Sequence, residues 1–242
     1  MLRALVVSVV VMWMCGFASC AEVSSQGEAN ALSRKTNELR SYQCGVEYLF
    51  SQPVLESKTL KTGSLCYARF GGGSKLRINF DTLTQDEGPQ QKYADCYIFD
   101  GQWLTHIDYQ IKQVRKKQLA EANEPVDAFE LARKSFPIIG FGKTEDLEKE
   151  FDVNQMDDSN QIVHLHLTVK PDSQYKDDYR SVEVWIDKGL MLPAKISAVS
   201  TEGDIYEIKF VSPLVNEKID EKVFDVKIPD GFGRPEIIPL KK

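Results

Sequence analysis

The sequence predicts an α+β fold that consists mainly of one long antiparallel β-sheet. Two groups of strand-like segments occur at the spacing of a meander, six in residues 42–118 and four in residues 161–211. An amphipathic segment with helical periodicity precedes them, and a second helical region separates the two groups. Because a sheet of about ten strands must curl, we expect a half-open barrel with an N-terminal helix and a helical lid.

Length and composition fit one large soluble globular domain or two small ones. The chain has 242 residues, of which 42% are hydrophobic and 27% are charged, and these values are typical of globular proteins. The net charge of −6 argues against a nucleic acid as the partner. After residue 21, no stretch approaches the ~20 apolar residues of a membrane helix. We therefore expect residues 22–242 to form a single exported domain.

The N-terminus has the features of a cleaved export signal. A short basic start, Met1–Arg3, precedes an apolar stretch at residues 4–14 that is too short to span a bilayer. Small residues follow, and their pattern fits cleavage after Ala21. Lipoprotein processing at Cys20 is the rival interpretation, and a phenylalanine three residues earlier makes it the weaker one. We expect export to the periplasm and removal of residues 1–21.

The first group of elements begins with a helix. Glu28–Arg40 is expected to be helical because apolar residues from Ala29 to Leu39 recur at helical spacing. Alternation of apolar and polar residues then predicts six strands, with Asp100-Gly101 as a tight hairpin between two of them. The strands are expected at Tyr42–Phe50, Thr59–Phe70, Lys75–Leu83, Tyr93–Phe99, Gln102–Tyr109 and Ile111–Gln118.

Residues 120–151 interrupt the strands. Helices are expected at Val126–Phe136 and Thr144–Phe151, and the segment between them is markedly apolar. Proline and glycine prevent this segment from forming a regular helix or strand. Such an insertion suits a lid over an apolar pocket, and a plug that fills one end of the core is the alternative. The lid residues would be Phe136, Ile138, Ile139 and Phe141.

The strands then resume with the same alternation. A final turn is expected at Ile219–Phe224, and no repeat or low-complexity linker interrupts the chain, which supports a single domain. The four further strands are expected at Gln161–Lys170, Tyr179–Asp187, Leu192–Thr201 and Asp204–Val211.

One predicted strand carries a charge near its end. Thr59–Phe70 is apolar in character, and Gly63 within it indicates a bend or a bulge. Because side chains alternate along a strand, Arg69 shares a face with Leu65 and Tyr67. A charge on a face that lines a cavity needs a partner. Arg69 is therefore a candidate functional residue.

Three cysteines remain after removal of residues 1–21. Cys44 and Cys66 lie on strands joined by a turn, and an antiparallel pairing centred near Leu55 would place them nearly opposite each other. A cross-strand disulfide would then leave Cys96 free. Three small buried thiols are the alternative. No Cys-x-x-Cys motif is present, so the sequence does not predict a redox site.

Candidate catalytic and metal-binding residues are few. His164 and His166 alternate on one strand, as in some zinc sites, but neither His106 nor a carboxylate has a spacing that supports a third ligand. A surface or cross-strand pair of histidines is the simpler interpretation. The sequence contains no nucleophile elbow, P-loop or dinucleotide-binding motif. We therefore expect no enzymatic activity, no cofactor and no metal site.

Several short motifs follow one another in a fixed order between residues 29 and 232. They are Gly63-x-Leu65-x-Tyr67-x-Arg69, Leu76-Arg77-Ile78, Phe99-Asp100-Gly101-x-x-Leu104, the apolar insertion, and Val223-Phe224 with Ile228-Pro229-x-Gly231. Together with the signal peptide and the first helix, this ordered set resembles the LolA-like family, the periplasmic carriers of outer-membrane lipoproteins.

The resemblance implies a LolA/LolB-like half-open barrel whose apolar cavity takes the acyl chains of lipoproteins or other lipids. It implies transport from an inner-membrane release complex to an outer-membrane acceptor, and we expect a monomer. It also implies that Arg69 bonds to lid carbonyls within Ser135–Gly142 and holds the empty cavity closed. An exported lipid-binding or envelope-stress-sensing domain of the same fold is the alternative.

The cavity wall would come from apolar residues on the predicted strands. For each of these residues, plain core packing is the alternative, because strand parity shifts at every bulge. The wall candidates are Val46, Tyr48, Leu65, Tyr67, Leu76, Ile78, Ile98 and Trp103.

Overall fold

The computed structural model describes residues 31–32, 34–36, 38–71, 73–121, 124, 126–128 and 149–240. The predicted signal peptide and the predicted lid residues 136–141 lie outside these ranges. In the part of the chain that is described, no helix has the length and apolar character needed to cross a membrane.

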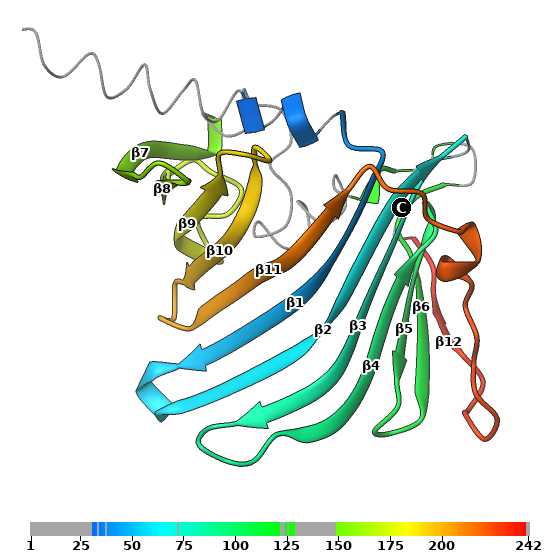
Figure 1. Ribbon diagram of the computed structural model, residues 1–242. Coiled ribbons are helices and arrows are strands. Elements are labelled where there is room, and N and C mark those ends of the chain that lie inside the picture. Colours follow the sequence, from blue (N-terminus) through cyan, green and yellow to red (C-terminus); the bar gives the residue numbers. More distant parts are fainter. Residues whose placement is uncertain are drawn as a thin grey trace, which may run out of the picture.

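The described chain folds as one open, curled sheet of 12 strands (Figure 1). Their spatial order is β12-β6-β5-β4-β3-β2-β1-β11-β10-β9-β8-β7. Neighbouring strands are antiparallel except for β12, which runs parallel to β6. The strands are β1 (Ser41–Gln52), β2 (Ser57–Phe70), β3 (Gly73–Gln85), β4 (Gln91–Phe99), β5 (Trp103–Asp108), β6 (Gln113–Gln118), β7 (Phe151–Asp158), β8 (Ile162–Val169), β9 (Tyr179–Asp187), β10 (Leu192–Ser200), β11 (Ile205–Val215) and β12 (Glu236–Ile238). Two 3-10 turns, η1 (Pro53–Leu55) and η2 (Glu221–Phe224), complete the described elements.

The sequence predicted the antiparallel sheet and its two meanders correctly. The six strands of the first group are β1 to β6, and the four of the second group are β8 to β11. The expected helix at Thr144–Phe151 is wrong at its end, because Phe151 begins β7. Asn154, Asp157 and Asp158 in β7 are residues that disfavour strands, so the strand depends on its pairing with β8 rather than on its own composition.

The expected N-terminal helix is described only in part. Residues 31, 32, 34–36 and 38 have helical backbone, and the Thr36 hydroxyl donates a 2.9 Å hydrogen bond to the Leu32 carbonyl. Leu32 and Leu39 are buried in the main core. The apolar stripe predicted from the periodicity therefore packs against the sheet.

The two faces of the sheet carry separate apolar clusters. The larger cluster contains residues from both meanders, including Phe99 of β4 and Leu165 of β8. The cluster runs continuously across the strands between them, along the concave side of the curled sheet (Figure 1). We call the face that bears this cluster the inner face. The smaller cluster, on the outer face, contains Cys96, Ile98, Ile107 and Val114.

The C-terminal segment packs along the outer face. The Arg77 guanidinium donates a 2.9 Å hydrogen bond from Nη1 to the Val223 carbonyl, and the ring of Phe224 meets that of Phe70 at 5.8 Å. Further along, Phe232 packs on the outer cluster with its ring 5.4 Å from that of Tyr109. This segment covers apolar residues that the sheet alone would leave on its surface.

Gly63 lies at a bulge, as the sequence predicted. The pairing of β2 with β3 changes register between Thr62 and Gly63. A Cβ atom at Gly63 would lie 1.8 Å from the backbone oxygen of Asn79. Because the clashing atom belongs to the neighbouring strand, only a backbone shift can relieve the overlap.

Gly63→Ala is therefore expected to lower the free energy of unfolding by about 1–3 kcal/mol. The urea midpoint of unfolding, followed by circular dichroism, measures this loss. Gly71→Ala is the matched control, because a Cβ at Gly71 meets nothing within 4 Å. Equal midpoints for the two variants would contradict the close backbone approach at Gly63.

Candidate functional site

The inner face gathers most of the predicted wall residues. Residues directly opposite each other in an antiparallel pair share a face. Leu65 lies opposite Ile78 and Tyr67 opposite Leu76, while Val46 and Tyr48 lie on the same face of β1. Val46, Leu65 and Tyr67 belong to the main cluster, and Leu76 and Ile78 pack against it. Six of the eight predicted wall residues therefore lie together.

Ile98 and Trp103 do not belong to this wall. Ile98 lies opposite Arg77 on β3 and belongs to the outer cluster. Trp103 lies opposite Gln118, and the Lys116 ammonium sits 5.4 Å from its ring centroid. The prediction that these two residues line the wall is therefore wrong. On β4, Tyr97 and Phe99 lie opposite Ile78 and Leu76, so the alternation of side chains places Ile98 on the other face.

Burial divides the inner face into two zones. Val46, Leu65 and Tyr67 are at most 2% exposed, so they form packed core. A second zone consists of half-buried rings on β1, β3, β9 and β11, which we call the aromatic floor. The aromatic floor comprises Tyr48, Phe50, Phe80, Tyr179 and Tyr206.

The rings of the aromatic floor contact one another across strands. Phe50 stacks on Tyr206 with centroids 5.0 Å apart, and Tyr48 meets Phe80 at 6.1 Å. Tyr179 packs edge-on against Tyr206 at 6.3 Å. Burial, with smaller contributions from Tyr206 and Tyr179, raises the pKa of Tyr48 to about 12. The floor is therefore an apolar surface that carries neutral hydroxyl groups.

The aromatic floor could be predicted only in part from the sequence. Alternation placed Tyr48 and Phe50 on one face of their strand, but it could not show that β11 lies beside β1. That pairing sets Tyr206 opposite Phe50. Contacts between strands more than 150 residues apart in the chain leave no local pattern in the sequence.

Arg69 lies on the inner face, as parity predicted. Its Nε donates hydrogen bonds to the Tyr67 hydroxyl at 2.7 Å and to Asp127 Oδ2 at 3.2 Å. The Tyr67 hydroxyl also donates to Asp127 Oδ2, at 3.1 Å. Burial and the nearby Asp127 carboxylate raise the pKa of Tyr67, which keeps its hydroxyl protonated. The expected carbonyl partners within Ser135–Gly142 lie outside the described residues.

These contacts hold residues 126–128 against the ends of the strands. The Ala128 amide donates a 2.6 Å hydrogen bond to the Ser74 hydroxyl, and the Val126 amide donates to the Gly101 carbonyl at 3.0 Å. With the Arg69–Asp127 ion pair, the start of the predicted insertion is fixed at three points. The sequence analysis did not identify Asp127, because nothing local distinguishes it from other acidic residues.

The predicted disulfide between Cys44 and Cys66 does not form. Cys44 lies opposite Leu65, whereas Cys66 lies opposite Gln43, so the two thiols point to opposite faces. The actual register differs by one residue from the one assumed, and a one-residue shift moves a side chain across the sheet. Cys44, Cys66 and Cys96 are all free, and burial raises the pKa of the Cys44 thiol to about 12.

The two strand histidines lie on the outer face. His164 Nε2 and His166 Nδ1 each lie 2.6 Å from an oxygen of Glu183, and His164 stacks on Trp185 with centroids 4.4 Å apart. This is the cross-strand arrangement that the sequence favoured. Across the described ranges, no group of three or more His, Cys, Asp or Glu side chains is placed to hold a metal ion.

The three free thiols predict how protein of residues 22–242 reacts with an alkylating reagent. Alkylation in denaturant without a reductant should add three groups to the intact mass, because no disulfide protects any of the three cysteines. Under native conditions the reaction should be much slower, since Cys44 and Cys96 are buried. A product with only one added group in denaturant would show that a disulfide exists.

Comparisons with known proteins were made on both sequence and structure. The family model described as "Outer membrane lipoprotein carrier protein LolA" matches residues 88–227. Comparison with curated protein sequences gives no match. An uncharacterized conserved protein from Thermus thermophilus superimposes with a TM-score of 0.51 at 10% identity, with 90% of this chain and 99% of that chain covered.

Two further solved structures are similar. MucB has a TM-score of 0.53 at 12% identity, with 85% of this chain and 63% of the MucB chain covered. The chain therefore spans less than two thirds of MucB. The Mycobacterium tuberculosis lipoprotein LppX has a TM-score of 0.45 at 11% identity, with 82% of this chain and 98% of that chain covered. At such identities, the likenesses to MucB and to the Thermus protein show a shared fold.

Proposed function

The chain belongs to the LolA family of outer membrane lipoprotein carrier proteins, and from this we propose that it is an exported carrier of acyl chains. Lipoprotein acyl chains would bind on the inner face of the sheet and travel from an inner-membrane release complex to an outer-membrane acceptor. Residues 1–21 would be removed on export to the periplasm, and residues 22–242 would act as a monomeric, non-enzymatic binding domain.

The aromatic floor is the observation that carries this proposal. Its five rings are half-buried rather than sealed in the core, so they offer apolar surface on the inner face. Burying one acyl CH2 group stabilises a complex by about 0.8 kcal/mol, and several chains can therefore be held firmly in water. The ring centroids lie 5.0–6.3 Å apart, the usual separation of aromatic pairs, so the floor is a continuous apolar surface.

A second candidate is an exported lipid-binding or envelope-stress-sensing domain of the same fold. The chain shares its fold with MucB, and MucB from Pseudomonas aeruginosa has been solved in complex with MucA. A sensor of this kind would bind a protein partner in response to lipid. We favour the carrier because the family model covers residues 88–227.

Arg69 is proposed to act as a latch for the lid. The ion pair between Arg69 and Asp127 joins the end of β2 to the start of the insertion. Opening this contact would remove one of the three contacts that fix the segment leading to the proposed lid residues Phe136, Ile138, Ile139 and Phe141. Because Arg69 and Asp127 are 36% and 25% exposed, water screens the ion pair, and its contribution is about 1 kcal/mol.

The carrier proposal predicts binding of a hydrophobic dye. A dye whose fluorescence rises in apolar surroundings should bind the protein of residues 22–242, and long-chain lysophospholipids should displace it. Phe80→Ser should weaken dye binding several-fold, because it removes one ring from the aromatic floor. Val226→Ser, at an exposed apolar residue of the C-terminal segment, is the control. Absence of dye binding by the unmodified protein would rule the carrier out.

The latch predicts a specific effect of Arg69→Leu. Loss of an interaction of about 1 kcal/mol with the closed state should change the affinity for acyl lipid, or the rate of its release, about five-fold. The expected direction is tighter retention, because the empty protein no longer returns to a latched state. Stopped-flow dye displacement measures both quantities. Arg234→Leu, at an exposed arginine, should leave both unchanged, and unchanged values for Arg69→Leu would remove Arg69 from the mechanism.

A further inference from the structure

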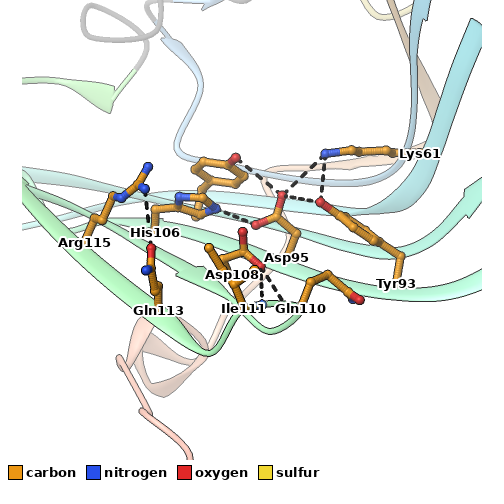
Figure 2. Close-up of polar contacts among 10 residues, drawn as sticks. Lys61, Tyr93, Asp95, His106, Asp108, Gln110, Ile111, Gln113 and Arg115 are labelled. Atoms are coloured by element: carbon orange, nitrogen blue, oxygen red, sulfur yellow. Dashed lines mark hydrogen bonds and ion pairs between the residues drawn. The ribbon is translucent and has the colours of Figure 1, made fainter. Parts of the chain in front are cut away.

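A compact polar cluster lies on the inner face beside the aromatic floor. Figure 2 shows Lys61 of β2, Tyr93 of β4 and His106 of β5 around the carboxylate of Asp95, which also lies on β4. His106 Nε2 lies 2.6 Å from Asp95 Oδ1. On the other oxygen, Tyr93 and Tyr97 donate hydroxyl hydrogen bonds at 3.3 and 3.4 Å, and the Lys61 ammonium lies at 3.5 Å. We call these five residues the Asp95 cluster.

Asp95 is a buried but ionised carboxylate. Its side chain is only 3% exposed. Burial by itself raises the pKa of Asp95, but the hydrogen bonds from His106 and Tyr93 and the charge of Lys61 outweigh burial, so this pKa lies below its usual value. Burial of an ionised carboxylate costs several kcal/mol unless it is paired and hydrogen-bonded. An apolar lipid wall has no need of such a group.

The Asp95 cluster is continuous with the aromatic floor. Lys61 lies directly opposite Tyr48 in the pairing of β1 with β2. Its ammonium is 5.5 Å from the centroid of Phe80 and 4.7 Å from that of Tyr93. An amphiphile whose chain lies on the floor would therefore place its polar end within reach of Lys61 and His106.

Two groups of the cluster retain hydrogen-bonding capacity toward the inner space. The side chains of Lys61 and His106 are 21% and 22% exposed. An ionised Asp95 can only accept, so His106 Nε2 carries a proton, and in the neutral imidazole Nδ1 is then an acceptor. Among the described residues, no hydrogen bond to Nδ1 is present. The Lys61 ammonium has three N–H groups, and its two polar partners are the Tyr93 hydroxyl and Asp95.

The cluster is surrounded by charges of both signs. Lys61 faces Asp95, and Arg115 forms a 3.3 Å ion pair with Glu236. Asp108 Oδ1 accepts hydrogen bonds from the backbone amides of Gln110 and Ile111 at 2.9 and 3.3 Å, which closes the turn between β5 and β6 (Figure 2). An anionic head group would approach the carboxylates of Asp95 and Asp108, and a cationic one would approach Lys61 and Arg115. Neither charge sign is favoured.

We propose that Lys61 and His106 bind a neutral, hydroxylated head group of the amphiphile whose acyl chain lies on the aromatic floor. A hydroxyl can accept from Lys61 and donate to His106 Nδ1, which matches the donor and the acceptor that the cluster presents. The glycerol hydroxyls of a monoacylglycerol have this chemistry. The inference rests on the proposed function, because it requires an acyl chain on the inner face.

The test compares two palmitoyl esters that differ only in their alcohol. Displacement of the hydrophobic dye is measured with 1-palmitoylglycerol and with methyl palmitate, for the unmodified protein and for His106→Phe. The phenylalanine preserves the stacking on Tyr97, whose ring lies 4.3 Å from that of His106 at 4°, but lacks both nitrogens. His106→Phe should weaken the displacement of the dye by 1-palmitoylglycerol about 5–10-fold, the usual effect of one or two lost hydrogen bonds. Displacement of the dye by methyl palmitate should stay unchanged.

The outer face supplies a matched control. His164 also bonds to a carboxylate at 2.6 Å and stacks on an aromatic ring at 4.4 Å. His164→Phe makes the same chemical change on the outer face and should leave the displacement of the dye by either ester unchanged. His106→Gln keeps both a hydrogen-bond donor for Asp95 and an acceptor. This variant should therefore recover part of the preference for 1-palmitoylglycerol over methyl palmitate. If His106→Phe does not fold, Lys61→Met provides the same comparison, because it removes the donor alone.

The outcomes separate the two proposals. Displacement by neither ester from the unmodified protein would overturn the carrier proposal and the inference together. Displacement by both esters with the same ratio in the unmodified protein and in His106→Phe would overturn only the head-group site. Stronger displacement by palmitoyl lysophosphatidate than by 1-palmitoylglycerol, lost in Lys61→Met, would replace the neutral head group by an anionic one and would also overturn the inference.

Discussion

The pairing of β1 with β11 is the contact on which the rest of the structure depends. Tyr42 lies opposite Val215 and Ser51 opposite Ile205, so the two meanders become one 12-stranded sheet. A sheet of this length must curl, and its inner face carries one continuous core that extends from β4 to β8. The same pairing places Phe50 against Tyr206, so the aromatic floor also exists because the two halves of the chain meet there.

The inner face then combines three environments along the same strands. On β4, Phe99 is sealed in the core, while Asp95, four residues and about 13 Å away, is the centre of a polar cluster. The aromatic floor adjoins this cluster, because the Lys61 ammonium lies 5.5 Å from the ring centroid of Phe80. A surface that changes from apolar to polar in this way suits an amphiphile better than it suits a uniform hydrocarbon. The outer face has a different character, with its apolar residues covered by the C-terminal segment.

Much of the fold could be predicted from the sequence, and the site only in part. Local alternation gave the strands, and parity placed Arg69 on the inner face, because both depend on neighbours in the chain. Ile98 and the Cys44–Cys66 pair were misplaced, since each required a register that only strand pairing determines. Asp127 and Asp95 were missed for the same reason: their partners Arg69, His106 and Lys61 come from other strands. The predicted lid lies beyond the described residues.

The parallel pairing of β12 with β6 has a consequence for the order of events in folding. Glu236–Ile238 is the edge strand next to β6, and in the chain it follows β6 only after all the other described strands of the sheet. Until it arrives, β6 presents an unpaired edge and the cluster around Ile98 and Val114 lacks Phe232. Unpaired edges with apolar neighbours are templates for intermolecular strand pairing. Long-range closure of this kind also slows folding, so the chain is most vulnerable to aggregation before Glu236–Ile238 has docked on β6.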